Sequence, residues 1–397
     1  MKKPKQILPF FLPLFVLLAC SKVNSTKELS ATIEQIECNL KTTIEMCTDA
    51  RTDVLVSPRS FVDGRFVMVP STDWTSGFFP GELWMMYELT SDPYWKEKAV
   101  EFTLPLENEK WNGQTHDIGF KMYCSFGRAW NVTNEPQYRE VLIQSAKALA
   151  DRFRPNIGCI RSWSHSTEKW DFPVIIDNVM NLELLFWAAN ETGNAMYREI
   201  AIKHAETTMQ HHFREDFSSY HVVDFDTETG AVQQKQSRHG YSDDSAWARG
   251  QAWALYGFTM VYRETGNKKF LKQAENIASY ILKHPNLPEN LIPYWDLNAP
   301  NIPDEPYDAS AAAIIGSALF ELSTFSENRD MYLNAANRIY ESLTSDQFLV
   351  APQKYNGFLL KHSTGSKPEQ QEVDVPLVYA DYYFMEMILL KSKLDTN

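Results

Sequence analysis

The sequence contains little cysteine, glycine or proline for its length, with 5, 16 and 20 of these residues among 397. The low glycine and proline content excludes a collagen-like chain, and the few cysteines exclude a small disulfide-stapled domain. A hydrophobic fraction of 44% excludes a disordered protein. The chain can therefore form a large globular core, either as two or three domains or as one repeat-built barrel.

The chain also lacks an excess of positive charge, because 38 Lys and Arg residues face 51 Asp and Glu residues and give a net charge of -13. A general nucleic-acid binder needs a cationic surface, so we expect no nucleic-acid partner. An anionic ligand would need its own local cations. Aromatic residues are abundant, with 11 Trp, 18 Tyr and 23 Phe, and their ring faces are suited to stacking on sugars or bases.

Long apolar runs are absent apart from one near the N-terminus. Three lysines among the first five residues precede the apolar residues 7–18, which are too few to span a bilayer stably. This pattern predicts an export signal over residues 1–19, followed by a polar tether over residues 20–27. The segment that ends at Cys20 resembles a bacterial lipobox, so we expect Cys20 to be acylated; an ordinary secretory signal is the alternative.

The lipobox-like segment also sets the expected location. We expect the mature protein in the periplasm, in contact with a membrane only through the lipid on Cys20. The outer membrane is favoured, because Ser21 is not the aspartate that retains some lipoproteins at the inner membrane.

Four cysteines follow Cys20, and none of them belongs to a CxxC pair or has a histidine at zinc-ligand spacing. Cys38 and Cys47 are nine residues apart in a predicted helix, about 13 Å along its axis and too far apart for a disulfide. The sequence therefore predicts mostly buried free thiols and no structural metal site.

Helical periodicity dominates the rest of the chain. The predicted helices cover residues 28–48, 77–90, 93–107, 117–131, 136–153, 177–191, 195–212, 244–264, 268–283, 309–324, 329–344 and 375–392. They make six pairs, and in four of the pairs a helix ends in a short turn of the Thr-Gly-Asn type and restarts at once. Such recurring joints indicate stacked antiparallel helical hairpins and an all-α fold.

Long loops between the helical pairs carry acidic, histidine and tryptophan side chains. They hold Trp74, then His116 and Asp117, then Trp163 and Asp177, then His221, His239 and Asp243, and later Asp308 and Asp374. If the hairpins close into a ring, one such loop from each pair meets at the same mouth. For Asp243, Asp308 and Asp374 we favour a role as helix N-caps.

Two faces of the predicted helix over residues 244–264 carry large side chains, one with Trp247 and the other with Arg249 and Trp253. A helix of this kind has little contact with solvent, and a buried arginine needs a partner. Arg249 is therefore expected to face a cavity and an anion, and an internal salt bridge is the alternative.

Several motifs together resemble one known enzyme family. They are residues 72–81 (TDWTSGFFPG), 116–120 (HDIGF), 176–178 (IDN), 240–245 (GYSDDS), 247–253 (WARGQAW), 373–376 (VDVP) and 379–383 (YADYY). In this order and combination, over nearly the whole chain, they are similar to the unsaturated glucuronyl hydrolases of glycoside hydrolase family 88.

The resemblance implies an (α/α)6 barrel over residues 28–397 that works without a metal or another cofactor. It implies that Asp177 is the general acid and base and that Asp117 assists it. The implied sugar-binding residues are Trp74, His116, Trp163, His221, Arg249 and Trp253. His239 is a further candidate, and it stands where some relatives have glutamine, which leaves the substrate preference open. Arg249, His221 or both are expected to provide positive charge for the substrate.

The implied substrate is an oligosaccharide with a 4,5-unsaturated uronic acid at its non-reducing end, as polysaccharide lyases produce, and we favour the glycosaminoglycan type. Hydration of its vinyl ether bond needs one acid rather than the two carboxylates of ordinary glycosidases. The pKa of Asp177 must then be raised, against the effect of a helix N-terminus, by the like charge of Asp117 and by aromatic neighbours. The alternatives are an unsaturated rhamnogalacturonyl hydrolase acting on pectin fragments and a non-catalytic glycan-binding lipoprotein.

Overall fold

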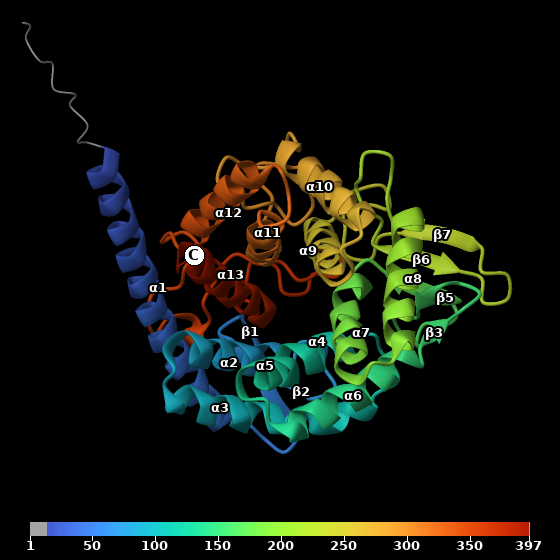
Figure 1. Ribbon diagram of the computed structural model, residues 1–397, viewed down its shortest axis with the longest axis horizontal. Helices are drawn as coiled ribbons and strands as arrows, with labels where there is room; N and C mark the ends of the chain where they lie inside the picture. Colours follow the sequence, from blue (N-terminus) through green and yellow to red (C-terminus); the bar gives the residue numbers. More distant parts are fainter. Residues whose placement is uncertain (1–13, 397) are drawn as a thin grey trace, which may run out of the picture.

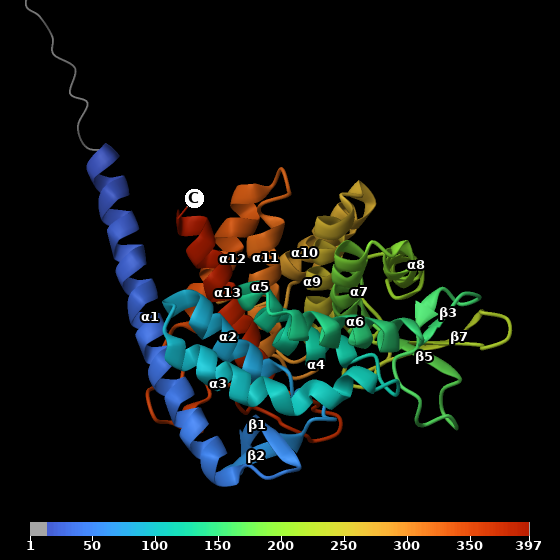
Figure 2. The same cartoon turned by 60° about the horizontal axis from the view of Figure 1, so that its bottom comes forward.

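Two concentric layers of helices make up most of the protein (Figures 1 and 2). The computed structural model describes the backbone of residues 14–396 and the side chains of residues 29–395. The inner layer consists of α2 (Phe78–Thr90), α4 (Ile118–Met122) with α5 (Arg128–Thr133), α7 (Asn178–Thr192), α9 (Ala248–Thr265), α11 (Ala309–Leu322) and α13 (Val378–Thr396). The outer layer consists of α1 (Leu14–Ala50), α3 (Pro93–Thr103), α6 (Pro136–Ala150), α8 (Ala195–His211), α10 (Lys268–Lys283) and α12 (Arg329–Leu343).

The inner helices close into a ring. Along it, α2 contacts α13, α13 contacts α11, and the contacts continue through α9 and α7 to α4, while α5 packs against α2. The outer helices α3, α6, α8, α10 and α12 pack on α2, α5, α7, α9 and α11 in turn. Helix α1 completes the outer layer between α12 and α3, since Tyr340 donates to Thr32 and the Lys41 ammonium lies over the ring of Tyr94. The predicted (α/α)6 barrel of six hairpins is confirmed.

The sequences of the two layers differ as their positions require. Helix α11 is buried on nearly all sides and is rich in alanine and isoleucine. Helix α10 instead buries one stripe, formed by Phe270, Gln273, Ala274, Ile277, Ala278 and Ile281. The three- and four-residue spacing of this stripe is that of a helix with one face on a core and the other in solvent.

The four predicted joints are tight turns with a left-handed residue. Ser91, Asn134, Gly193 and Gly266 have φ of 58°, 54°, 71° and 62° and each ends a helix. A left-handed residue at this place stops a helix and lets the chain reverse. The next helix begins within a few residues, so partners in a hairpin lie side by side.

Several helix boundaries differ from the prediction. The helix expected over 117–131 is interrupted by a π-turn at Tyr123–Gly127, and α9 and α13 begin at Ala248 and Val378, later than expected. The N-cap prediction holds for Asp308, whose side chain accepts from the first amides of α11. It is wrong for Asp243, which accepts from the N–H of Ser237, and for Asp374, which lies 2.6 Å from His362 Nδ1. These two carboxylates brace loops instead.

Short strands occur in the long loops and were not predicted. β1 (Leu55–Val62) and β2 (Arg65–Pro70) form a hairpin, β3 (Phe153–Arg154) pairs with β4 (Cys159–Ile160), and β5 (Phe172–Ile175), β6 (Val222–Phe225) and β7 (Val232–Gln236) form a sheet. The hairpin turn is Asp63-Gly64, with both residues at positive φ. An Asp-Gly pair between two apolar runs is a hairpin signal that the helical interpretation passed over.

The N-terminal predictions fall largely outside the described residues. Residues 1–13 are not described, and the polar stretch 20–27 continues the backbone of α1. The side chain of Cys20 is not among those described. No helix in the described range is both long and apolar enough to span a membrane. The other four cysteines are free thiols, and three of them are buried.

Candidate active site

Several inner helices present their N-terminal ends to one mouth of the barrel, where the structure has a cleft of about 610 Å³. Its lining includes Asp117, Asp177 and Trp247, which immediately precede α4, α7 and α9, and Tyr379 near the start of α13. Helix N-termini carry partial positive charge and unpaired amides. The mouth therefore suits an anionic ligand in spite of the negative net charge of the chain.

The structure brings eight of the nine predicted catalytic and binding residues to this cleft. They are Trp74, His116, Asp117, Trp163, Asp177, His221, His239 and Arg249. Trp253 is not part of the lining, because it is fully buried among rings that include Phe120 and Tyr383. It lies behind the cleft rather than in its wall.

Asp117 is held by the two residues before it. Thr115 Oγ1 donates to Asp117 Oδ2 over 2.6 Å, and His116 Nε2 lies 3.3 Å from Asp117 Oδ1. Asn181 sets the tautomer of His116: its Oδ1 accepts from Phe120 N–H, so its Nδ2 donates to His116 Nδ1 over 3.0 Å. Burial lowers the pKa of His116, so the ring is neutral and directs its Nε2–H toward Asp117.

Asp177 precedes α7, yet its side chain makes no capping hydrogen bond to that helix. Burial raises the pKa of Asp177 to about 7, and the like charge of Asp117 adds to this effect. The positive charge of Arg249 and a hydrogen bond to the backbone of Asp177 act in the opposite direction. The predicted rise in pKa is confirmed, although removal from water is its main cause and Asp117 contributes less.

His221 faces Asp177 as a neutral ring. Its Nδ1 accepts from the backbone N–H groups of Arg238 (3.2 Å) and His239 (3.3 Å), so the proton lies on Nε2, 3.7 Å from Asp177 Oδ2. Burial, reinforced by His239 and Arg238, holds the pKa of His221 well below its usual value. This side chain is therefore a neutral hydrogen-bond donor, which leaves Arg249 as the predicted source of positive charge.

Arg249 faces the predicted cavity and also makes the internal salt bridge that was the alternative prediction. It lines the cleft, and it forms an ion pair with the buried Asp308 over 2.7 Å. It also donates to the carbonyls of Thr364 and Gly365, both at 2.5 Å, and its guanidinium lies 4.6 Å from the ring of Trp247. Because Asp308 neutralises much of its charge, Arg249 offers an anionic ligand a rigid donor more than a free cation.

Buried polar atoms without hydrogen-bond partners occur in the wall of the cleft and directly behind it. Among the described side chains, Asp177 Oδ2, His221 Nε2, Trp163 Nε1 and Trp253 Nε1 are buried and make no hydrogen bond. Buried polar groups in folded proteins are normally paired, so this cluster sets the surroundings of Asp177 apart from an ordinary core.

Comparisons with known proteins agree with this geometry. The model of Glycosyl Hydrolase Family 88 matches residues 59–386. The chain belongs to this family. It is 50% identical over 327 residues, 82% of each chain, to an unsaturated glucuronyl hydrolase of Formosa agariphila. It is 32% identical to an unsaturated chondroitin disaccharide hydrolase of Streptococcus pyogenes, over 82% of this chain and 83% of that one.

A solved structure of a family 88 enzyme has the same fold. It is an unsaturated glucuronyl hydrolase specific for heparin, 42% identical, with a TM-score of 0.90 over 94% of this chain and 98% of that chain. The predicted class, a glycosidase of the unsaturated glucuronyl hydrolase type, is thereby confirmed.

Sequence reasoning missed residues that line or support this family 88 cleft. Asn181, which orients His116 from outside the cleft lining, lies four residues after Asp177, about one helical turn further along, and this spacing could have been noticed. Arg59 forms a bidentate ion pair with Glu372 at 2.7 and 2.8 Å and also bonds Asp73 at 2.9 Å. No local signal predicts this contact, because it joins β1 to a loop 313 residues away.

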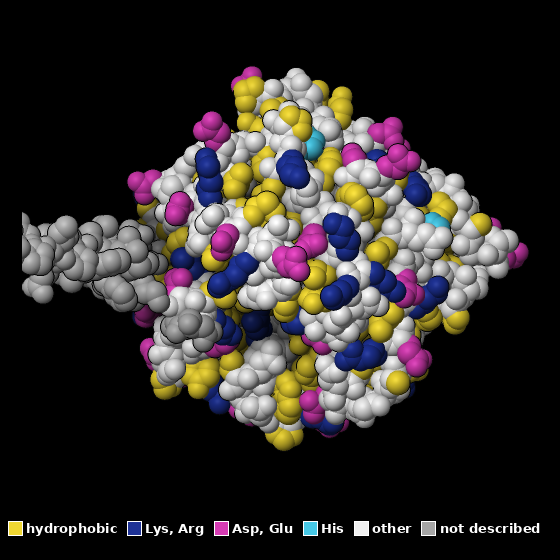
Figure 3. Space-filling view, turned by 45° about the horizontal axis from the view of Figure 1, so that its top comes forward, with side chains coloured by type: hydrophobic (Ala, Val, Ile, Leu, Met, Phe, Trp, Pro, Cys, Tyr) yellow, Lys and Arg dark blue, Asp and Glu magenta, His cyan; other side chains and the backbone are white. Residues whose placement is uncertain are grey.

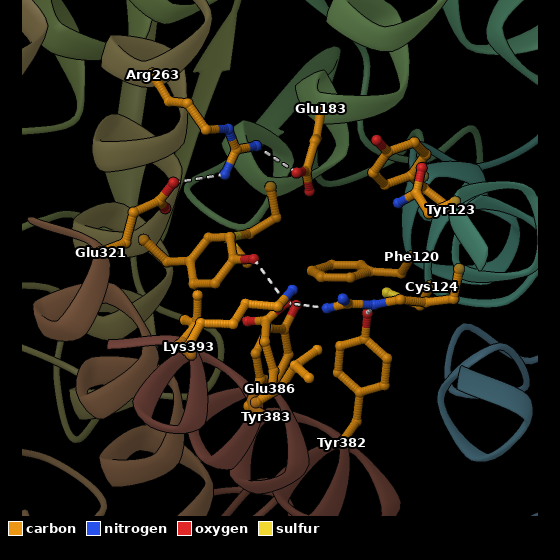
Figure 4. Close-up of a pocket in the computed structure, with 17 residues that line it drawn as sticks. Phe120, Tyr123, Cys124, Glu183, Arg263, Glu321, Tyr382, Tyr383, Glu386 and Lys393 are labelled. Atoms are coloured by element: carbon orange, nitrogen blue, oxygen red, sulfur yellow. Dashed lines mark hydrogen bonds and ion pairs between the residues drawn. The ribbon is translucent and has the colours of Figure 1, made fainter. Parts of the chain in front are cut away.

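A second pocket, of about 150 Å³, lies deeper in the family 88 barrel. Figure 4 shows Arg263 between Glu183 and Glu321, with which it is ion-paired. Arg128 is paired with Glu386 in the same pocket. These paired charges link inner helices to one another, so we assign ligand binding to the larger cleft.

Acidic and basic side chains are interspersed on the face drawn in Figure 3. That face therefore presents no broad area of positive charge. Among the described residues, no group of three or more His, Cys, Asp or Glu side chains is arranged to hold a metal ion.

Proposed function

We propose that this protein removes a 4,5-unsaturated uronic acid from the non-reducing end of lyase-generated oligosaccharides, with glycosaminoglycan fragments as the favoured substrates. The observation that carries the proposal is the state of Asp177, a carboxyl that lines the cleft and has a pKa of about 7. Such a group can hold a proton near neutral pH and give it to a substrate.

The reaction is the hydration of a vinyl ether. Asp177 gives its proton to C4 of the unsaturated sugar, where a C–H bond forms, and positive charge develops at C5 and the ring oxygen. Water then bonds to C5 and loses a proton to the Asp177 carboxylate, which regenerates the acid. The resulting hemiketal opens to a keto sugar and releases the neighbouring saturated sugar. One carboxyl therefore both donates and accepts the proton.

The neighbours of Asp177 divide the remaining tasks. Asp117, fixed by Thr115 and His116, keeps a second carboxylate next to the reacting centre, where it stabilises the positive charge that develops at C5. The neutral His221 directs its Nε2–H toward Asp177, and the ring of Trp163 forms part of the wall that the sugar contacts. The N-terminal ends of α4, α7 and α9 add partial positive charge for the uronate carboxylate.

The preference for glycosaminoglycan fragments rests on the relatives, whose names specify chondroitin disaccharides and heparin. The test is a panel of disaccharides made by lyases from chondroitin, hyaluronan, heparin and pectin, with loss of the unsaturated chromophore as the readout. Turnover of glycosaminoglycan disaccharides supports the proposal. Turnover of the pectin product alone favours a rhamnogalacturonyl hydrolase, and binding without turnover favours a non-catalytic glycan-binding protein.

Solvent deuterium tests the mechanism independently of the substrate preference. In deuterated water, the product should carry one deuteron at C4, because the proton on Asp177 exchanges with solvent. Product without deuterium at C4 would exclude protonation at that carbon.

We further propose that Cys20 is acylated and anchors the mature protein to the outer membrane, facing the periplasm. The support is the sequence around it, with an N-terminal positive charge and an apolar run too short to span a bilayer. Mass spectrometry of the native N-terminus should find a lipid on Cys20. A protein cleaved without lipid, and found in the soluble fraction, would contradict this.

A further inference from the structure

Arg152, two residues after α6, is a buried arginine without an acidic partner. Arg152 is 7% exposed, and no carboxylate among the described side chains lies within ion-pair distance of its guanidinium. Its guanidinium instead donates to backbone carbonyls, from Nε to Arg161 over 2.8 Å and from Nη1 to Gly113, and its Nη2 is buried without a partner. Burying an unpaired charge is unfavourable, so its retention calls for a reason.

The contacts of Arg152 join the two loops that carry cleft residues. Gly113 belongs to the loop that leads into Asp117, and Arg161 begins the segment that carries Trp163. Arg152 Nη1 also lies 3.3 Å from the Oγ of Ser164, the residue that follows Trp163 in the chain. The same loops meet through His116 N–H, which donates to the Ser162 carbonyl over 2.9 Å. Arg152 therefore clamps the two loops from behind, outside the cleft itself.

The positive charge of Arg152 acts on His116 and Asp117, in one of these two loops. Burial, together with repulsion from Arg161 and Arg154, lowers the pKa of Arg152 to about 10, and attraction by Asp117 opposes this. At neutral pH the guanidinium remains protonated. Its positive charge also contributes to lowering the pKa of His116, so it reaches both the imidazole and the carboxylate of the His116-Asp117 pair.

We propose that Arg152 is a positioning residue for the reaction, which fixes the loop carrying Asp117 against the loop carrying Trp163. Arg152 touches neither substrate nor reacting atoms, and it acts through Asp117. This inference rests on the proposed function, in which Asp117 assists Asp177.

The test compares Arg152→Gln, which can still donate hydrogen bonds, with Arg152→Lys, which keeps the charge. The control is Arg154→Gln, which removes an exposed neighbouring charge outside the cleft lining. For Arg152→Gln we expect kcat to fall about 10- to 100-fold with little change in KM, because the acid-base geometry is disturbed. This split between kcat and KM distinguishes a loss of positioning from a loss of substrate binding.

Arg152→Lys should retain more of the parent kcat than Arg152→Gln, because its ammonium can still donate to the backbone carbonyls that Arg152 holds, and Arg154→Gln should leave kcat and KM unchanged. A kcat that does not fall in Arg152→Gln, or a KM that rises as much as kcat falls, overturns the proposal. A parent enzyme without turnover would refute the proposed function instead, so the two failures are distinguishable.

A stability measurement covers the case in which Arg152→Gln does not fold. Asp117→Asn in the parent background removes the carboxylate that opposes the buried charge of Arg152. At pH 5.5, below the pKa of about 7 of Asp177, this variant should unfold at a lower temperature than the parent. Where Arg152→Gln does fold, the loss should shrink in the double variant, because the coupled partner is already absent. An unchanged or higher unfolding temperature for Asp117→Asn overturns the proposed coupling.

Discussion

Replacing Asp177 by Asn tests the raised pKa on which the proposed chemistry depends, through stability as well as activity. Burial raises the pKa of Asp177 from 3.8 to about 7. The folded protein therefore binds a proton more tightly at this site than the unfolded chain does. Between about pH 4 and pH 7 the free energy of unfolding falls as the pH rises, because the unfolded chain loses the proton first.

The magnitude follows from the size of the shift. A rise of about three pKa units corresponds to about 4 kcal/mol, fully lost above pH 7 and fully present below pH 4. Asn at this position carries no charge at any pH. Asp177→Asn should therefore match the parent in stability at pH 4 and exceed it by up to about 4 kcal/mol at pH 8, or about 5 °C in Tm for a chain of this size.

The assay is thermal unfolding of both proteins at pH 4 and pH 8, with Asp53→Asn as a control at an exposed aspartate. In parallel, kcat for an unsaturated disaccharide should fall about 10²- to 10⁴-fold in Asp177→Asn, since its general acid is lost, while binding is retained. The reasoning is refuted if Asp177→Asn gains no stability between pH 4 and pH 8 relative to the parent, or if its kcat stays near that of the parent.

Three further predictions concern the surroundings of this carboxyl and the barrel. Asp117→Asn should slow turnover and move the alkaline limb of the pH–rate profile to lower pH, because the like charge that helps to raise the pKa of Asp177 is gone. Arg249→Met should raise KM and cost about 3–5 kcal/mol in unfolding free energy, because Asp308 is left buried without its partner; an unchanged KM would contradict its role in binding. Burial raises the pKa values of Glu82 on α2 and Asp381 on α13, that of Asp381 to about 8. The free energy of unfolding should therefore decline as the pH rises through about 8. Urea unfolding at pH 6 and pH 9 should show a smaller decline in Glu82→Gln than in the parent protein.

The parts of the fold that the sequence predicts well are those with local causes. Each tight joint needs only one residue that tolerates a left-handed backbone, so Gly193 and Gly266 mark helix ends by themselves. The sequence predicts the starts of α9 and α13 too early, because an aspartate caps a helix only when no other donor takes its carboxylate. Asp243 finds the amide of Ser237 and Asp374 finds His362, and neither remains available to a helix.

The candidate site divides in the same way. Asp117 and Asp177 stand at the starts of inner helices, so closing the ring is enough to bring them to one mouth. The partners that adjust them depend on contacts between distant segments: Arg249 meets Asp308 across 59 residues, and Arg152 meets Gly113 across 39. No local pattern distinguishes an arginine that faces a ligand from one that faces a carboxylate or a carbonyl.

The arrangement of charge at the mouth reconciles two opposite demands of the proposed reaction. Binding a uronate requires positive potential, and the helix N-termini provide it although Arg59, Arg238 and Arg249 are each paired with an acid. The same potential favours the ionised form of Asp177, which would prevent it from donating a proton. Burial of Asp177 is the larger effect and brings its pKa to about 7. A cleft wide enough to hydrate Asp177 would therefore still attract the substrate but would no longer protonate it.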